Sequence, residues 1–157
     1  YLVGEKSSEA MYRACLDAAA EYGVADYVHM TGNQPQSVCR QYARNALATL
    51  LPGEWNRVNI FYEVMGEGCV VLTNNNHSVD EFIDRGNNCL VYDTEAEAAE
   101  QLIALLNDPQ RAQRIRANAH RTAIEQFLTL EKRFGMEAQL VMDTASGNNT
   151  AHYPEII

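Results

Sequence analysis

The sequence has 157 residues, 46% of them hydrophobic, so it is long enough to fold around one core and too short to argue for two domains. Its formal net charge of −9 argues against nucleic acid as a partner, because phosphate binding needs a basic surface. No apolar run approaches the ~20 residues that a membrane span requires. The sequence begins at Tyr1 within an apolar run and without an initiator Met. We expect it to be part of a longer polypeptide.

The first half alternates short apolar runs with helical patterns. Ser7 and Ser8 are predicted N-caps of a helix whose apolar residues recur at spacings of three and four until Gly23. The predicted elements are a strand at 1–4, this helix, a strand at 27–30, a helix from Pro35 to about Ala43, and a strand at 46–51.

The second half continues the alternation after a turn at Pro52-Gly53. Thr94 and Glu97 form a capping box, and Asp108-Pro109 is a second helix start. The predicted elements are a helix at about 59–67, a strand at 69–73, a short helix at 79–84, a strand at 89–92, helices from Thr94 and from Asp108 to about Phe127, and a last helix from about Thr129. We place the folded domain at 1–143 and a polar tail or linker at 144–157.

This order predicts an α/β fold, because short strands joined by helical crossovers pair in parallel and need helices on both faces. We expect a Rossmann-like, doubly wound parallel sheet of about five to six strands. Ligands of such sheets bind outside the carboxyl ends of the strands. Those ends are predicted at Gly4 to Lys6, Gly32 to Gln34, Pro52 to Glu54, Thr73 to Ser78, and Tyr92-Asp93.

The four cysteines, Cys15, Cys39, Cys69 and Cys89, form no CxxC pair and have no His at metal-ligand spacing. Three of them lie in helical or strand-like apolar patterns. We interpret them as buried, reduced thiols of a cytosolic protein, with a redox or zinc role as the alternative. The sequence predicts no metal site.

The run EVMGEGCVVLTNNNHSVDEFIDRGNNCLVYD, at 63–93, resembles the donor-binding half of the family 4 glycosyltransferases. These are retaining enzymes of the GT-B fold, in which two Rossmann-like domains face each other. Their pattern is approximately E-A-M-A-x-G-x-P-V-V-A-S, followed by G-G-x-P-E-I-I-x-D-G-x-N-G-x-L-V. The positions that match in register are Glu63, Met65, Gly68, Val70, Val71, Glu81, Gly86, Asn88, Leu90 and Val91. The resemblance covers nearly all of residues 1 to 143.

The resemblance implies a nucleotide-sugar donor as substrate. Glu63 would accept hydrogen bonds from the ribose hydroxyls, since a carboxylate can accept two at once. The backbone amides of Val58, Asn59 and Ile60 would stabilise the leaving phosphate, and the loop at Gly32 and Asn33 would contact the base. The alternative for Glu63 is a polar residue on an amphipathic helix.

Further residues of the predicted rim are candidates for the donor site. Gly4 lies at the first strand end. Lys6 and Arg57 are candidate phosphate contacts, with ordinary surface charge as the alternative for each. Arg111, Arg114 and Arg121 recur at helical spacing, which favours a solvated face over an anionic membrane surface, because no large apolar residues accompany them.

The sequence departs from the family at the sugar end of the site. The family has two Glu with seven residues between them, which counts back from Glu63 to Trp55, whereas Glu54 stands one residue earlier. We assign the catalytic role at the sugar and its phosphate to Glu54, with Trp55 as the alternative. His77-Ser78 replaces a frequent Gly-Gly pair, which would narrow the sugar pocket.

The predicted function is therefore transfer of a hexose, with retained configuration and without a cofactor or bound metal, to an acceptor that the sequence does not identify. The resemblance places a first strand, the basic residues that face the diphosphate and an acceptor-binding domain before Tyr1, so the chain alone is expected to be inactive. The alternatives are a GT-B-like scaffold without catalysis and a sugar-nucleotide epimerase relative. We expect a cytoplasmic protein, with the inner face of a membrane as an alternative location reached through other parts of the protein.

Overall fold

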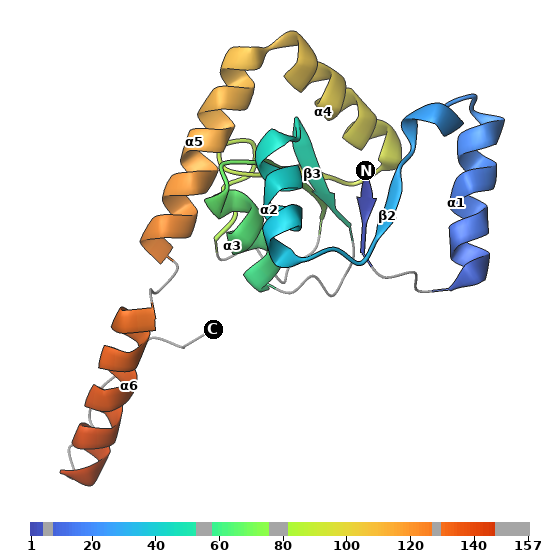
Figure 1. Cartoon of the computed structure of the whole chain (residues 1–157). Coiled ribbons are helices and arrows are strands. Elements are labelled where there is room, and N and C mark those ends of the chain that lie inside the picture. Colours follow the sequence, from blue (N-terminus) through green and yellow to red (C-terminus); the bar gives the residue numbers. More distant parts are fainter. Residues whose placement is uncertain (5–7, 53–57, 76–81, 127–129, 147–157) are drawn as a thin grey trace.

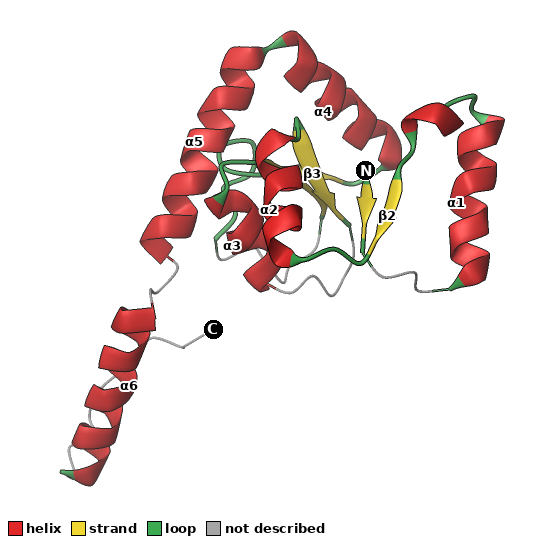
Figure 2. Ribbon diagram, in the orientation of Figure 1, coloured by secondary structure: helices red, strands yellow, loops and turns green. Residues whose placement is uncertain are grey.

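The computed structural model describes residues 1–4, 8–52, 58–75, 82–126 and 130–146 (Figure 1). Helices surround a centre of short strands (Figure 2). The strands are β1 (Leu2–Val3), β2 (Met30–Gly32), β3 (Ala48–Leu51), β4 (Val70–Asn74) and β5 (Leu90–Tyr92). The helices are α1 (Glu9–Glu21), α2 (Gln36–Asn45), α3 (Val58–Gly66), α4 (Glu95–Asn107), α5 (Pro109–Gln126) and α6 (Leu130–Ala145).

All strand pairs in the described residues are parallel, which confirms the predicted α/β class. β4 lies between β3 and β5, and β1 pairs with β2. The difference from the prediction is that the strands form two hydrogen-bonded sheets, of two and three strands, rather than one. The carboxyl ends of β3, β4 and β5 lie along one edge because the three strands run in the same direction.

β4 is buried on both faces, as expected for the middle strand of a parallel sheet. Val71 packs with Phe61 and Met65 of α3 on one face. Val70 and Leu72 pack with Leu90 of β5 and Leu105 of α4 on the opposite face. Small and branched residues of α5 pack into both clusters: Ala119 and Ala123 into the first, and Ala112 and Ile115 into the second. This packing confirms helices on both faces.

The predicted helix starts at Ser8, Thr94 and Asp108 are confirmed. The Ser8 side chain accepts a hydrogen bond from the Met11 amide at 3.1 Å, and Thr94 accepts one from the Glu97 amide at 3.2 Å. The Asp108 carboxylate accepts one from the Arg111 amide at 2.9 Å. Each side chain satisfies a backbone donor that has no partner within the helix.

Two predicted elements differ from the structure. The strand predicted at 27–30 forms at Met30–Gly32, because a 3₁₀ turn at Ala25–Tyr27 occupies the preceding residues. The helix predicted at 79–84 is absent from its described part, 82–84, where the backbone instead hydrogen-bonds to the Asn88 side chain. Residues 79–81 lie outside the described residues.

The carboxyl-terminal helix α6 extends away from the rest of the molecule (Figure 1). Phe134, Val141 and Met142 on it are more than half exposed. Within the described ranges, no helix is both long and apolar enough to span a membrane.

Candidate functional site

The candidate site begins where β1 and β2 end. The Gly4 amide donates to the Gly32 carbonyl at 3.0 Å, so these two predicted rim residues are brought together. Their φ angles are +145° and +67°, which strain any residue with a side chain. A Cβ added at either position would meet no atom within 4 Å, so the glycines leave open space beside the backbone. Asn33 follows Gly32 and is exposed.

The loop after β2 is held by its own side chains. Gln34 donates its side-chain amide to the Thr31 carbonyl at 2.7 Å. The Cys39 thiol, one turn into α2, contacts the Gln34 carbonyl at 3.6 Å. Thr31 contacts the Leu2 carbonyl through its hydroxyl at 3.3 Å, which links the loop to β1. These bonds fix the backbone at Gly32 and Asn33 relative to the start of α2.

Glu63 lies on α3, and its exposed carboxylate reaches the same region. The Gln36 side-chain amide donates to Glu63 Oε1 at 2.8 Å. Gln36 is the first residue of α2, directly after the loop that contains Gly32 and Asn33. The hydrogen bond therefore connects the predicted ribose-binding residue with the predicted base-binding loop. Sequence reasoning did not identify Gln36, and its only signal was its place after Pro35 at a helix start.

A second polar contact joins α2 to Glu67, the residue directly after α3, two turns further along α2. The Arg44 guanidinium donates to Glu67 Oε2 from Nε at 3.0 Å and from Nη2 at 2.5 Å. Arg40 lies 3.8 Å from the other oxygen of the same carboxylate. The first residue of α2 thus contacts Glu63 and its last turn contacts Glu67, so the two helices run in the same direction and both begin near the ligand edge.

The start of α3 lies at Val58, Asn59 and Ile60, the residues predicted to present amides to phosphate. The first amides of a helix have no acceptor within the helix and attract anions. Asn59 and Ile60 are exposed. The remaining predicted residues, Lys6, Glu54, Trp55, Arg57, His77 and Ser78, lie outside the described residues. Their roles stay predictions.

The ends of β4 and β5 carry a polar cluster that the sequence did not predict. Asn75 donates its side-chain amide to Asp93 Oδ1 at 2.8 Å and accepts a bond from Arg85 at 2.7 Å. The backbone N–H of Asn75 also donates to the Tyr92 carbonyl at 2.9 Å. These bonds extend the β4–β5 pairing past the strand ends and hold three polar side chains at this edge.

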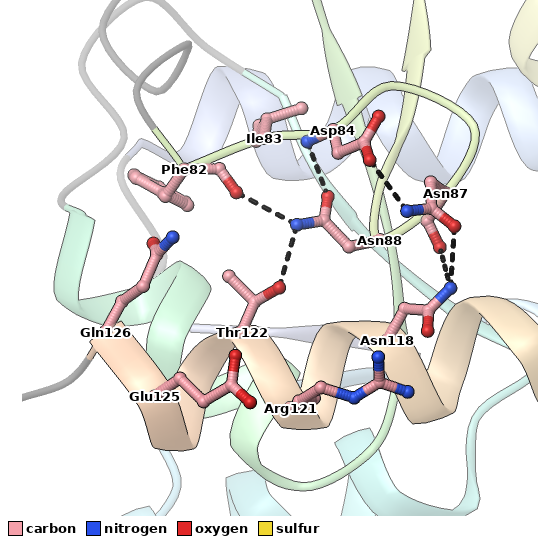
Figure 3. A pocket seen from close by; sticks show the side chains of 10 residues that line it. All are labelled: Phe82, Ile83, Asp84, Asn87, Asn88, Asn118, Arg121, Thr122, Glu125 and Gln126. Carbon is pink, nitrogen blue, oxygen red and sulfur yellow. Dashed lines mark hydrogen bonds between the residues drawn. The ribbon is translucent and has the colours of Figure 1, made fainter.

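A hollow of about 290 Å³ lies between α5 and residues 82–88, and none of the predicted donor-site residues that the structure describes lines it (Figure 3). Much of its polar lining is hydrogen-bonded internally. Asn88 donates to the Phe82 carbonyl and the Thr122 hydroxyl, and Asn118 donates to Asn87 (Figure 3). We therefore interpret these side chains as the contacts that attach the segment before β5 to α5.

No group of three or more His, Cys, Asp or Glu side chains able to hold a metal ion occurs in the residues that the structure describes. Cys69 and Cys89 are buried as predicted, whereas Cys15 and Cys39 are only partly buried. Burial raises the thiol pKa of Cys69, and it raises that of Cys89 to about 12. Neutral thiols are poor metal ligands and nucleophiles.

The sequence profile of the glycosyl transferase-like family matches residues 16–136, which is most of the chain. The chain belongs to this family. No match was found among curated proteins.

Solved structures of larger proteins share the fold. Crystal structures of HepE from Anabaena match with TM-scores of 0.74 in complex with UDP and 0.76 in complex with UDP and glucose, at 19% and 18% identity over 90% of this chain. Sucrose-phosphate synthase from Thermosynechococcus elongatus matches with a TM-score of 0.76 at 19% identity over 92% of this chain. The family member described here spans 40% of HepE and 38% of the synthase. Its fold is the Rossmann-like half of a GT-B fold.

Proposed function

We propose that this chain is the donor-binding domain of a retaining glycosyltransferase that transfers a hexose from a nucleoside-diphosphate sugar. The observation that carries the proposal is the Glu63 carboxylate, which lies on α3 and is hydrogen-bonded through Gln36 to the start of α2, beside the glycine loop at the ligand edge. HepE, which shares the fold, has been crystallised with UDP and with UDP-glucose. That likeness supports a uridine nucleotide as the first donor to test.

In this proposal the donor lies along the carboxyl ends of the strands. The base contacts the backbone at Gly4, Gly32 and Asn33, and the ribose hydroxyls donate to Glu63. The diphosphate faces the first amides of α3, at Val58, Asn59 and Ile60, which would stabilise charge as it develops on the leaving group. The described edge supports the first two contacts through the glycines' open backbone and the exposed carboxylate.

The sugar end depends on residues outside the described ranges. Glu54 is proposed to act at the sugar and its phosphate, with Lys6 and Arg57 as phosphate contacts. No cofactor or metal takes part in the proposed reaction. We also propose that an amino-terminal acceptor-binding domain completes the enzyme, that the chain alone does not turn over, and that the protein acts in the cytoplasm.

A GT-B-like binding domain without catalysis is the second candidate. It is favoured by Trp55 at the position where the family has its first Glu, eight residues before Glu63. Sugar transfer by the longer polypeptide, measured with and without Glu54→Gln, separates the two candidates. Turnover that falls more than donor affinity supports the enzyme. Donor binding without any transfer supports the scaffold.

Glu63→Ala is expected to weaken binding of the nucleotide-sugar at least tenfold, about 1.4 kcal/mol, because the ribose hydroxyls lose a charged acceptor. Isothermal titration calorimetry with UDP-, GDP- and ADP-sugars would measure this loss for the base that binds. The matched control is Glu100→Ala, which removes an exposed carboxylate from α4 on the other side of the sheet. Equal affinity of folded Glu63→Ala and the control would refute the ribose assignment.

A further inference from the structure

The Glu63 carboxylate has a neighbour that no sequence pattern assigns. Gln36, 27 residues earlier in the chain, donates its side-chain amide to Glu63 Oε1 at 2.8 Å. Both side chains are exposed at the ligand edge. An exposed hydrogen bond between flexible side chains contributes little to the stability of the fold. Because this bond lies beside the candidate site, we ask what it does for ligand binding.

The backbone that carries Gln36 is held from both sides. The preceding loop is fixed by the bonds of Gln34 to Thr31 and of Cys39 to Gln34. At its far end, α2 is joined to α3 by the contacts of Arg44 and Arg40 with Glu67. The distance between the Gln36 and Glu63 backbones is therefore set by the packing of the two helices, which brings the amide to the carboxylate.

The chemistry of the pair leaves Glu63 able to bind a ribose. A carboxylate has about four acceptor positions, and Gln36 occupies one of them. The remaining positions suffice for two hydroxyl donors. Because the amide is neutral, it orients the carboxylate without cancelling the negative charge that strengthens the bonds to hydroxyl groups. Orienting a flexible side chain before binding removes part of the entropic cost of binding.

We propose that Gln36 is the positioning residue of the ribose site: it holds the Glu63 carboxylate in the orientation that accepts the ribose hydroxyls, and so selects ribonucleotide donors over analogues that lack those hydroxyls. This inference rests on the proposed function, in which Glu63 binds the ribose. It assigns ribose selectivity to two helices rather than to one carboxylate.

The test compares nucleoside diphosphates with dideoxy analogues that lack both ribose hydroxyls. Calorimetry would measure the uridine, guanosine and adenosine forms and continue with the base that binds most tightly. Gln36→Leu is expected to weaken the ribonucleotide about three- to tenfold, the range for one side chain that loses its orientation, and the dideoxy analogue less than twofold. Gln36→Glu, which keeps the size but repels Glu63, is expected to weaken the ribonucleotide further.

Gln41→Leu is the matched control, because Gln41 is an exposed glutamine on the same helix. It is expected to leave both affinities unchanged. Equal weakening of the two ligands by Gln36→Leu would show a structural role and overturn the inference. An unchanged Gln36→Leu beside a weakened Glu63→Ala would overturn the inference and leave the proposed function intact. Absence of binding by all three bases, or an unaffected Glu63→Ala, would overturn both.

Discussion

The thiol of Cys89 lies in the core, where its sulfur contacts the Val71 carbonyl at 3.4 Å. Burial raises the pKa of this thiol from 9.0 to about 12, and the nearby Arg85 only partly opposes the rise. The pKa of the Cys69 thiol is raised by burial in the same way. The folded protein therefore keeps both thiols neutral under conditions in which an unfolded chain ionises them.

This difference predicts how stability depends on pH. Above about pH 9 the unfolded chain releases the Cys89 proton and the folded chain retains it until about pH 12, so the free energy of unfolding should fall as pH rises through this window. By pH 10.5 the loss attributable to Cys89 should reach about 2 kcal/mol. Urea unfolding at pH 8 and 10.5 would measure it.

Cys89→Ala serves as the comparison. The variant should be less stable at pH 8, because it removes a buried side chain, but its stability should fall less steeply with pH. Tyr92, whose phenol pKa is also raised by burial and by Glu95, is present in both proteins and contributes equally. The same pH dependence in both proteins would mean that the Cys89 thiol ionises alike in the folded and unfolded chains.

At the residue scale, the candidate site was only partly predictable. Glu63 was identified through its register with neighbouring family positions such as Met65 and Val70, which the structure places in the core. Gln36 lies outside the family pattern at 63–93 and matches none of its positions. Its contact with Glu63 arises only when α2 packs beside α3, and a single sequence contains no record of that packing.

Among the elements, the segment before β5 shows how one side chain replaces regular structure. Asn88 is 4% exposed and uses its whole amide: it accepts from the Asp84 amide at 2.8 Å and donates to the Phe82 carbonyl at 2.9 Å and the Thr122 hydroxyl at 3.0 Å. A helix at 79–84 would have bonded the Asp84 amide to the carbonyl four residues earlier, so Asn88 supplies the acceptor that the helix would have provided. The apolar pattern of VDEFID could not reveal this competition.

Asn88→Ala is expected to lower the free energy of unfolding by about 2 kcal/mol, because it leaves the buried Phe82 carbonyl and the part-buried Asp84 amide without this partner. Chemical denaturation would measure the change. The control is Asn118→Ala, which removes a more exposed amide from α5 that bonds to Asn87. A loss for Asn88→Ala no larger than that of the control would contradict the structural role.

Strand positions were predictable to within a few residues. The apolar run at 27–30 predicted a strand, but the Tyr27 amide bonds to the Val24 carbonyl at 2.9 Å in a 3₁₀ turn, and pairing with β1 starts only at the His29 carbonyl. The strand therefore forms at Met30–Gly32. Local turn bonds compete with sheet pairing over a few residues, and hydrophobic pattern does not decide between them.

At the scale of the whole molecule, the alternation of strands and helices suffices to predict a parallel α/β fold. It does not predict that the strands form two separate sheets. In the described residues, β1 bonds to β2 and β3 bonds to β4, with no ladder between β1 and β3. Leu2 and Leu50 are about half exposed, whereas the residues of β4 from Val70 to Thr73 are fully buried. The extra first strand and the acceptor-binding domain implied by the family resemblance stay predictions.

A crystal structure of the protein with the nucleoside diphosphate that binds most tightly would test whether Glu63 binds the ribose. We expect the ribose hydroxyls within hydrogen-bond distance, roughly 2.6–3.2 Å, of the Glu63 carboxylate, with Gln36 still bonded to it and the base beside Gly32. A nucleotide elsewhere, such as in the hollow beside Arg121, with Glu63 in contact only with Gln36 and solvent, would contradict it.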